Sequence, residues 1–345
     1  MIKKISLIRN ILVSNFCRVP SPFKITFAAT YRCNLKCRAC RIWQKTSCDE
    51  IGSEEVEKIF KSINNLNWID LTGGELTLRE DMHGIVRAIL RNSPKLAIFH
   101  ISTNGQLPDK AVSIAQELLQ PGLMPVINVS IDGPRQVNDF MRGVPGAYDT
   151  SIETYLKLKR LSRAHCYISC TISRYNVDHI DGLIAGLKKD IRDFDLTDLH
   201  FNMFHESGHY YDNKGSGFAA GLDPGRIKRY FSLSIKGHPI KVFLEKEYMK
   251  GLGRYLGGDR FFLRCQALNA SCFIDPSGAV YACGMYDARV GDLRRSDFNL
   301  DALWNAKAVL SIRKDISEKK CPGCWSPCEA YPAILGSIVP GCSMK

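Results

Sequence analysis

The sequence lacks the features of a membrane-spanning, secreted or nucleic-acid-binding protein. None of its apolar runs approaches the roughly 18 residues that a membrane-spanning helix needs. The N-terminal stretch MIKKISLIRNILVSNF begins like a signal peptide, but Arg9 and Asn10 interrupt its apolar part and no small-residue cleavage site follows. No basic run is interleaved with aromatic residues, so we expect no nucleic-acid partner. These absences predict a cytoplasmic protein.

Cysteine and positive charge, in contrast, are plentiful. The chain has 14 cysteines, and because the cytosol keeps thiols reduced, we expect metal ligands, reactive thiols or buried residues rather than disulfides. The net charge of +12 suits an anionic partner. Iron–sulfur clusters held by thiolates are negative, however, and basic residues would balance them. With 345 residues the chain has room for two domains.

Short β-rich runs alternate with amphipathic helical runs between residues 24 and 205. This alternation occurs six times, at a spacing of roughly 30 residues, and is typical of an α/β fold with a parallel sheet and crossover helices. The pattern alone also fits a doubly wound open sheet. The strands that we expect are 24–30, 68–74, 96–105, 125–133, 166–173 and 198–205.

Polar or glycine-containing motifs follow four of these strands. Cys33 follows the first, TGGE (72–75) the second, STNG (102–105) the third and SIDG (130–133) the fourth. In parallel α/β folds, sites assemble at the carboxyl ends of the strands. The four motifs therefore predict one active site at that edge of the sheet.

The stretch YRCNLKCRAC (31–40) places three cysteines after the first strand with the spacing C-x3-C-x2-C. Three thiolates do not complete a structural zinc site, which needs four ligands. They suffice for three irons of a cubane cluster and leave the fourth iron open. An open iron is what a substrate or cofactor needs if it is to bind the cluster directly.

CNLKCRAC resembles the cluster motif of the radical S-adenosylmethionine (SAM) superfamily, C-x3-C-x-aromatic-C, with Ala39 where an aromatic residue is usual. The resemblance implies a partial (β/α)6 TIM-like barrel and a [4Fe–4S] cluster on Cys33, Cys37 and Cys40, with SAM on the open iron. One electron, from a reductant such as flavodoxin or ferredoxin, would cleave SAM into methionine and a 5′-deoxyadenosyl radical. That radical would abstract hydrogen from an unactivated carbon.

Other motifs resemble the SAM-binding parts of this family. TGGE looks like the GGE motif that receives the amino group of SAM, where glycines let the backbone approach a ligand. SIDGP (130–134) and residues 138–149 are similar to the stretch with ribose and carboxylate contacts, although Asp132-Gly133-Pro134 also fits a simple tight turn. The resemblance implies no particular catalytic residue. The implied cofactor-binding residues are Gly73, Gly74, Glu75, Ser102, Asn104, Ser130, Asp132 and Arg142.

Seven more cysteines lie between residues 265 and 342. Residues 272–283 are typical of a hairpin around a DPSG turn, and CPGCWSPC (321–328) adds C-x2-C-x3-C. The arrangement resembles the SPASM/twitch extension of the family but has one cysteine fewer. We expect one or two auxiliary [4Fe–4S] clusters, with zinc as the competing metal. The candidate ligands are Cys265, Cys272, Cys283, Cys321, Cys324, Cys328 and Cys342.

These patterns divide the chain into four expected parts: an N-terminal amphipathic segment (1–23), a radical SAM barrel (24–205), an insertion or connector (206–260) and a cysteine-rich auxiliary-cluster domain (261–345). Apolar residues recur at helical spacing in the first part, with basic residues on other faces. Such a helix fits a membrane surface, or it packs on the open bottom of the barrel. The stripe consists of Ile5, Ile8, Leu12 and Phe16, and the basic residues are Lys3, Lys4 and Arg9.

The sequence therefore predicts a radical SAM oxidoreductase or C–C bond-forming enzyme. The amphipathic N-terminus favours a membrane-lipid chain as the substrate and contact with a membrane surface. The alternative is a peptide or protein, because peptide modification is the commonest role of relatives with this extension. A more remote alternative is an iron–sulfur electron carrier or sensor, for which an open cluster beside a GGE loop is needless.

Overall fold

The computed structural model describes residues 2–46, 49–217, 222–228, 230 and 239–338. Within these ranges, one nine-stranded sheet has the order β6-β5-β4-β3-β2-β1-β7-β8-β9. Its first six strands in the sequence are all parallel, as the alternating pattern predicts. They are β1 (Lys24–Ala28), β2 (Trp68–Thr72), β3 (Ile98–Thr103), β4 (Met124–Ser130), β5 (His165–Ile172) and β6 (Leu199–Met203).

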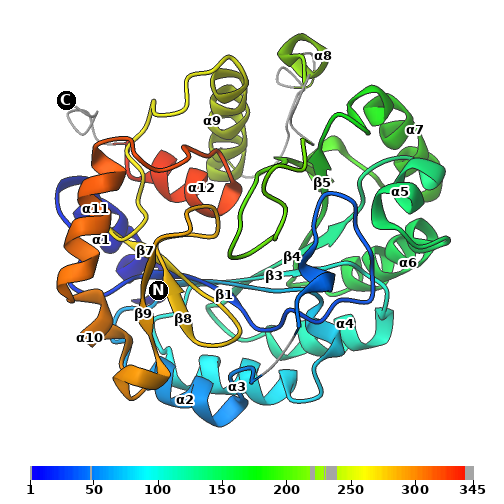
Figure 1. The fold of residues 1–345 in the computed structure, drawn as a ribbon. Coiled ribbons are helices and arrows are strands. Elements are labelled where there is room, and N and C mark those ends of the chain that lie inside the picture. Colours follow the sequence, from blue (N-terminus) through cyan, green and yellow to red (C-terminus); the bar gives the residue numbers. More distant parts are fainter. Residues whose placement is uncertain (1, 47–48, 218–221, 229, 231–238, 339–345) are drawn as a thin grey trace.

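Helices follow these strands and lie on the outer side of the curved sheet (Figure 1). They are α2 (Ser53–Lys61), α3 (Met82–Asn92), α4 (Pro108–Glu117), α5 (Arg135–Arg142), α6 (Ala147–Lys159) and α7 (Ile180–Asp190). Short 3-10 helices occur at Ile42–Gln44, Leu76–Leu78, Val177–His179, Leu196–Asp198 and Arg294–Ser296. This arrangement is a partial TIM-like barrel and confirms the expected fold.

The two faces of the sheet differ in chemistry. Residues such as Ile25, Ile69 and Phe99 point outward and join the main apolar core with the helices. The alternate residues point inward, because successive side chains of a strand leave on opposite faces. Most of the inward residues are polar, with Ala28, Ile98 and Val126 among the apolar exceptions, and neighbouring strands pair them in register. They include Thr26, Asp70, His100, Ser102, Asn128, Ser130, Tyr167, Ser169, His200 and Asn202.

The cysteine-rich part continues the barrel sheet. Strand β7 (Ser271–Ile274) pairs parallel to β1, and β8 (Ala279–Tyr281) and β9 (Arg289–Asp292) extend it antiparallel. The hairpin expected over 272–283 is therefore β7–β8. Helices α10 (Leu300–Trp304), α11 (Lys307–Ser317) and α12 (Pro327–Leu335) follow. Helices α8 (Pro224–Lys228) and α9 (Pro239–Leu256) precede the hairpin.

The N-terminal helix α1 (Ile2–Phe16), dark blue in Figure 1, is seen behind α11. Its fully buried residues are the polar Asn10, Ser14 and Asn15, whereas Ile5 and Ile8 are exposed. The helix therefore packs by a mixed side, on which partly buried apolar residues also contact the main core: Leu7, Ile11 and Val13. Among the described residues, no helix is long and apolar enough to cross a membrane.

Candidate cluster and cofactor sites

The three-cysteine loop lies at the carboxyl end of the sheet, directly after β1. Cys33, Cys37 and Cys40 are close enough to interact electrostatically, and Cys33 and Cys40 pack in one small apolar cluster. Burial, aided by the negative neighbours, raises the pKa of Cys33 to about 11 and that of Cys40 to about 12. Thiols in such surroundings become thiolates only when a metal binds them.

The GGE motif packs directly against this loop. Gly74 N–H donates to Thr30 O (2.6 Å) and Glu75 N–H to Arg32 O (2.8 Å). A Cβ on Gly73 would lie 2.5 Å from Thr30 O, and one on Gly74 would lie 2.7 Å from the carbonyl carbon of Arg32. The glycines thus allow a close approach, as expected, but the backbone they approach in this structure is that of the cysteine loop.

The Glu75 carboxylate acts inside the protein. It is fully buried and accepts hydrogen bonds from Thr103 Oγ1 (2.8 Å), Asn104 N–H (2.6 Å) and Thr77 Oγ1 (2.7 Å). Burial raises its pKa, while these donors favour the charged form. Glu75 therefore fixes the STNG turn in place, and its contact with the amino group of SAM stays a prediction.

Asn104 connects that turn to the first cysteine. Its Nδ2 donates to Asn34 Oδ1 (2.7 Å) and lies 3.8 Å from Cys33 Sγ. Ser102 lies two residues earlier on the inner face, with its Oγ 3.5 Å from His100 Nε2. Ser130 also belongs to the inner face, at the end of β4. The structure thus gathers these three expected residues at the edge that holds the cysteines.

Asp132 and Arg142 form a buried ion pair beside the second cysteine. Arg142 Nη2 lies 2.9 Å from Asp132 Oδ2, and Arg142 Nη1 lies 3.9 Å from Cys37 Sγ. Asp132 Oδ1 also accepts from Thr171 N–H (2.8 Å), so the segment is more than a tight turn. Arg142 Nε is buried without a partner among the described residues. The guanidinium thus contacts both Asp132 and Cys37, and its role in binding SAM stays a prediction.

Sequence reasoning missed Gly143. It ends α5 with φ of 71°, and a Cβ there would approach Lys36 O, because Lys36 N–H and Arg38 N–H donate to Arg142 O and Met141 O (3.1 and 2.9 Å). Helix α5 itself was not expected. The signal available was the glycine after Arg142, which is typical of a helix end.

The first part of the expected insertion or connector (206–260) contacts the cysteine loop and the end of β2. Tyr210 Oη lies 3.0 Å from Thr72 Oγ1 and donates to Gly73 O (3.3 Å). Asn213 Nδ2 donates to Ala39 O (2.9 Å). Ala39, where an aromatic residue is usual, packs instead against Met141 and Phe204. No spacing in the sequence predicted these contacts, because the residues that meet are more than a hundred positions apart in the chain.

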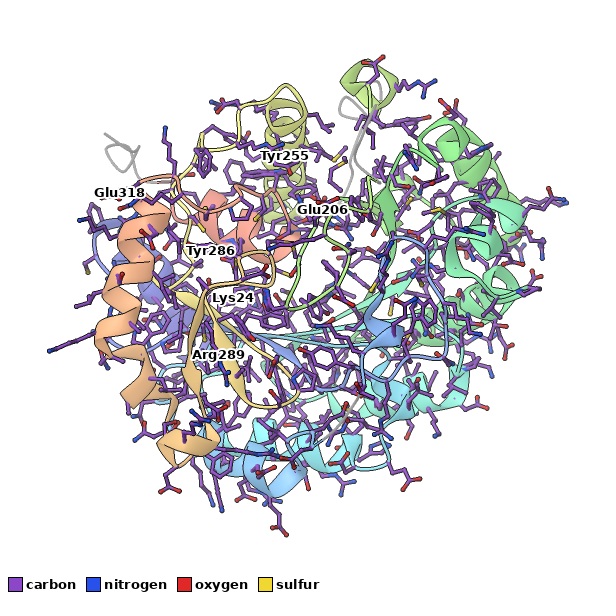
Figure 2. All side chains as sticks on the ribbon, viewed as in Figure 1. Lys24, Glu206, Tyr255, Tyr286, Arg289 and Glu318 are labelled. Carbon is purple, nitrogen blue, oxygen red and sulfur yellow. The ribbon has the colours of Figure 1, made fainter. Side chains whose placement is uncertain are left out.

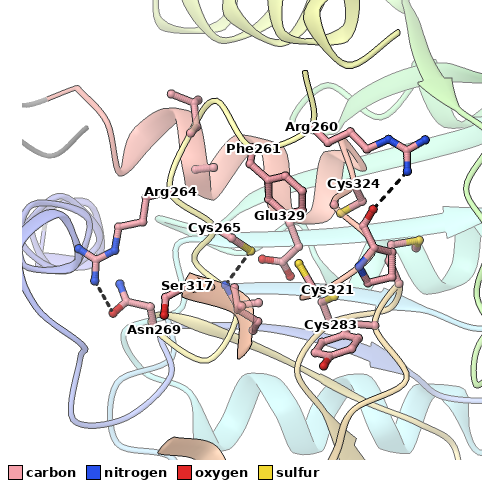
Figure 3. A pocket seen from close by; sticks show the side chains of 18 of the residues that line it. Arg260, Phe261, Arg264, Cys265, Asn269, Cys283, Ser317, Cys321, Cys324 and Glu329 are labelled. Carbon is pink, nitrogen blue, oxygen red and sulfur yellow. Dashed lines mark hydrogen bonds between the residues drawn. The ribbon is translucent and has the colours of Figure 1, made fainter. Parts of the chain in front are cut away.

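A second group of cysteines surrounds a cavity of about 620 Å³ in the C-terminal part (Figure 3). Cys265, Cys283, Cys321 and Cys324 all line it. Burial raises the pKa of Cys324 to about 11, and burial likewise raises the pKa values of Cys265 and Cys283. Four thiols around one cavity are the ligand number of one fully coordinated cubane cluster.

Three other candidate ligands do not line this cavity in the described structure. Cys272 is inside the main core, because its partner in register is the outward-pointing Ile25. Cys328 interacts with the barrel residues Asp70 and Lys24, and burial raises its pKa to about 12. Cys342 lies outside the described residues.

A buried ionic chain runs from the inner face of the barrel to the auxiliary cavity. Lys24 is completely buried near the centre of the molecule (Figure 2) and pairs with Asp70 at 2.7 Å. Asp70 also lies 3.2 Å from His100 Nδ1. Glu329, which interacts electrostatically with Lys24, lines the auxiliary cavity and accepts from Ser271 Oγ at 2.8 Å. Its pKa is raised to about 7, chiefly by burial.

Both cysteine groups suit iron–sulfur clusters better than a single metal ion. In the described part of the chain, no three His, Cys, Asp or Glu side chains converge as the ligands of one ion do. Each thiolate of a cubane cluster binds a different iron, so its ligands stand farther apart. The residues present therefore fit clusters, with an open position at Cys33, Cys37 and Cys40.

Comparison with known proteins agrees with this geometry. Residues 28–185 match the model of the radical SAM superfamily, and residues 265–329 match the SPASM model, an iron–sulfur cluster-binding domain. The chain belongs to the radical SAM superfamily and carries a SPASM domain. It is therefore a radical SAM enzyme, whose first domain binds a [4Fe–4S] cluster and SAM and whose second binds auxiliary iron–sulfur clusters.

Among its relatives, the mycofactocin maturase of Mycolicibacterium smegmatis is 25% identical over 340 residues, covering 95% of this chain and 81% of the relative. The antilisterial bacteriocin subtilosin biosynthesis protein AlbA of Bacillus subtilis is 25% identical, covering 88% of this chain and 66% of AlbA. The structure of Streptococcus suis SuiB bound to precursor peptide SuiA has a TM-score of 0.60 at 16% identity, covering 86% of this chain and 67% of SuiB. The last comparison concerns the fold alone.

Proposed function

We propose that this enzyme modifies a peptide, with the polar inner face of the barrel as the place where the substrate residue reacts. The observation that carries the proposal is the chemistry of that face, on which hydroxyl, amide, imidazole and carboxylate groups outnumber apolar side chains. Several of them, including His100, Ser102 and Asn128, retain partial exposure inside the barrel.

A lipid chain gains little binding free energy from such a surface. Each methylene group transferred from water to an apolar site contributes about 0.8 kcal/mol, and this gain is lost where the walls are polar and hydrated. A peptide has amide and polar side-chain groups, and these can form hydrogen bonds with the polar inner face in place of water. The polar face thus favours the peptide alternative over the lipid chain that the N-terminal segment suggested.

The relatives support the same choice. One is named as a maturase and another as a bacteriocin biosynthesis protein, and each match spans most of this chain. These names describe the relatives, and they make a peptide precursor the first substrate to test here. We infer no lipid-modifying activity.

For the cofactors, we propose that Cys33, Cys37 and Cys40 hold the SAM-binding cluster, and that the four cavity cysteines hold one auxiliary cluster. When bound, SAM and its cluster supply a 5′-deoxyadenosyl radical that abstracts hydrogen from the substrate. The chain's own residues shape the surroundings. Glu75 and Arg142 fix the loops around the cysteines, and Asp70 orients His100 by its contact with Nδ1, while Ser102 Oγ lies 3.5 Å from His100 Nε2.

The test uses anaerobically reconstituted enzyme with a reductant such as flavodoxin. Synthetic peptides encoded by short reading frames beside the gene, deuterated at the side chains, are compared with deuterated phospholipid. We expect one peptide to accelerate formation of 5′-deoxyadenosine and to transfer deuterium into it. Deuterium transfer from the phospholipid instead would contradict the proposal. Reconstituted, reduced protein that forms no 5′-deoxyadenosine at all would favour an electron carrier.

A further inference from the structure

Helix α1 presents an apolar stripe to the outside of the protein. The exposed fractions are 56% for Ile5, 57% for Ile8, 46% for Leu12 and 69% for Phe16. Their spacing of three or four residues puts them on one side of the helix. A contiguous exposed patch of large apolar residues marks a surface that contacts something else.

The packing of the opposite side keeps the stripe exposed. Asn10 Nδ2 donates to Asn67 Oδ1, Asn67 Nδ2 donates to Ser6 Oγ (3.1 Å), and Asn269 Nδ2 donates to Ser14 O (3.1 Å). Asn10 and Ser14 are buried, so rolling the helix to bury its stripe would leave these groups without partners. The outward apolar side is therefore fixed by the fold.

The charged residues of α1 itself are all positive. Lys4 and Arg9 are exposed beside the stripe, and Arg18 follows the end of the helix. The first 48 residues contain ten lysines and arginines but no aspartate or glutamate. A partner for this surface thus combines an apolar layer with negative charge.

More arginines gather at the carboxyl end of α1. Arg264 Nη1 donates to Asn15 O (3.3 Å), and Arg264 and Arg313 both donate to Asn269 Oδ1 (3.3 Å each). Burial lowers the pKa of Arg313, and repulsion from Arg18 and Arg264 lowers it further. Arg264 and Arg313 also line the cysteine cavity, so a negative cluster there would balance part of this charge.

We propose that α1 is an interfacial helix that holds the enzyme on an anionic membrane surface. Its stripe enters the boundary between headgroups and acyl chains, while Lys4 and Arg9 reach the lipid phosphates. A second copy of the chain or a protein partner also meets an apolar stripe, but the positive charges of the helix favour anionic lipid. The proposal goes beyond the peptide-modifying function and depends on neither cofactor nor substrate.

The experiment is sedimentation of the full-length holoenzyme with vesicles of phosphatidylcholine, with and without phosphatidylglycerol. We expect binding that requires phosphatidylglycerol and weakens with salt. The double variant Ile8→Ser/Leu12→Ser should bind about tenfold or more weakly, because both apolar side chains are lost from the interface. Lys4→Glu and Arg9→Glu should each weaken binding at low salt by about fivefold or more. These side chains are exposed, so the fold should remain intact.

Phe243→Ser on α9 is the matched control, since Phe243 is 43% exposed but lies on another helix. It should bind vesicles like the parent protein. Full-length protein that ignores phosphatidylglycerol vesicles overturns the proposal, and so does a control variant that loses as much binding as the double variant. Sedimentation velocity provides a third check. A dimer that Ile8→Ser/Leu12→Ser separates, in a protein that does not bind vesicles, would assign the stripe to a second copy.

Discussion

Cys37 shows how single residues define the SAM-binding site. It is the middle cysteine of the loop, and Arg142 Nη1 lies 3.9 Å from its sulfur. Cys37→Ala removes one of three proposed iron ligands, so we expect no formation of 5′-deoxyadenosine and a loss of about four irons per chain. Anaerobic iron analysis and product chromatography check this. Normal product formation by the variant would show that Cys37 is not a ligand.

Lys24 balances the negative charge of Asp70 in the interior of the barrel. It pairs with Asp70 at 2.7 Å, and both side chains are buried. Lys24→Met leaves the carboxylate without its main cation, which costs about 3–5 kcal/mol of unfolding free energy. Urea unfolding should show a lower midpoint. The double variant Lys24→Met/Asp70→Asn should recover much of the loss, and a single variant as stable as the parent would contradict this role.

The Lys24–Asp70 pair also makes the stability of the protein depend on pH. Burial would raise the pKa of Asp70, but Lys24 and His100 outweigh it and hold that pKa well below its ordinary value of about 3.9. A carboxyl with a lowered pKa in the folded state contributes stability that is fully present above the unfolded pKa. We therefore expect the contribution of Asp70 to disappear as the pH falls below about 4. In the Asp70→Asn variant, the free energy of unfolding should therefore depend less on pH below about 4.

At the scale of elements, the cysteine loop depends on the turn after β2. Gly74 is in contact with the Arg32 carbonyl, and a Cβ there would lie 2.7 Å from its carbon. Gly74→Ala must displace the loop, so we expect a reduced occupancy of the first cluster by iron analysis and electron paramagnetic resonance. Gly182→Ala in α7 is the control, because its Cβ would make an ordinary contact of 3.4 Å with Pro134. Equal iron content in both variants would contradict the prediction.

At the scale of the whole molecule, the two cysteine groups are separate sites on one continuous sheet. Replacing Cys33, Cys37 and Cys40 together by Ala should remove SAM cleavage but leave an iron–sulfur spectrum from the cavity cysteines. Adding Cys283→Ser should remove that remaining signal, whereas adding Cys328→Ser should preserve it, because Cys328 does not line the cavity. If the triple variant contained zinc and no iron, the cavity cysteines would form a zinc site, and the prediction of an auxiliary cluster would be wrong.

The sequence alone determined the class of fold, the three-cysteine loop and the superfamily. These rest on local patterns: the alternation of strands and helices, a C-x3-C-x2-C spacing and glycines in turns. Such patterns are readable because hydrophobic periodicity and short-range geometry act within a few residues. The six strands lie where that alternation places them.

Only the tertiary structure decided which distant residues meet. It turned the Glu75 carboxylate inward, joined Arg142 to Asp132, and separated Cys272 and Cys328 from the cavity cysteines. It also showed that the inner face is mostly polar and that α1 packs by its asparagines and by Leu7 and Ile11, with its apolar stripe outward. These outcomes depend on hydrogen bonds and packing between segments far apart in the chain. A helical or strand period gives the face on which a residue lies, but the partner that this face meets is determined by the assembled fold.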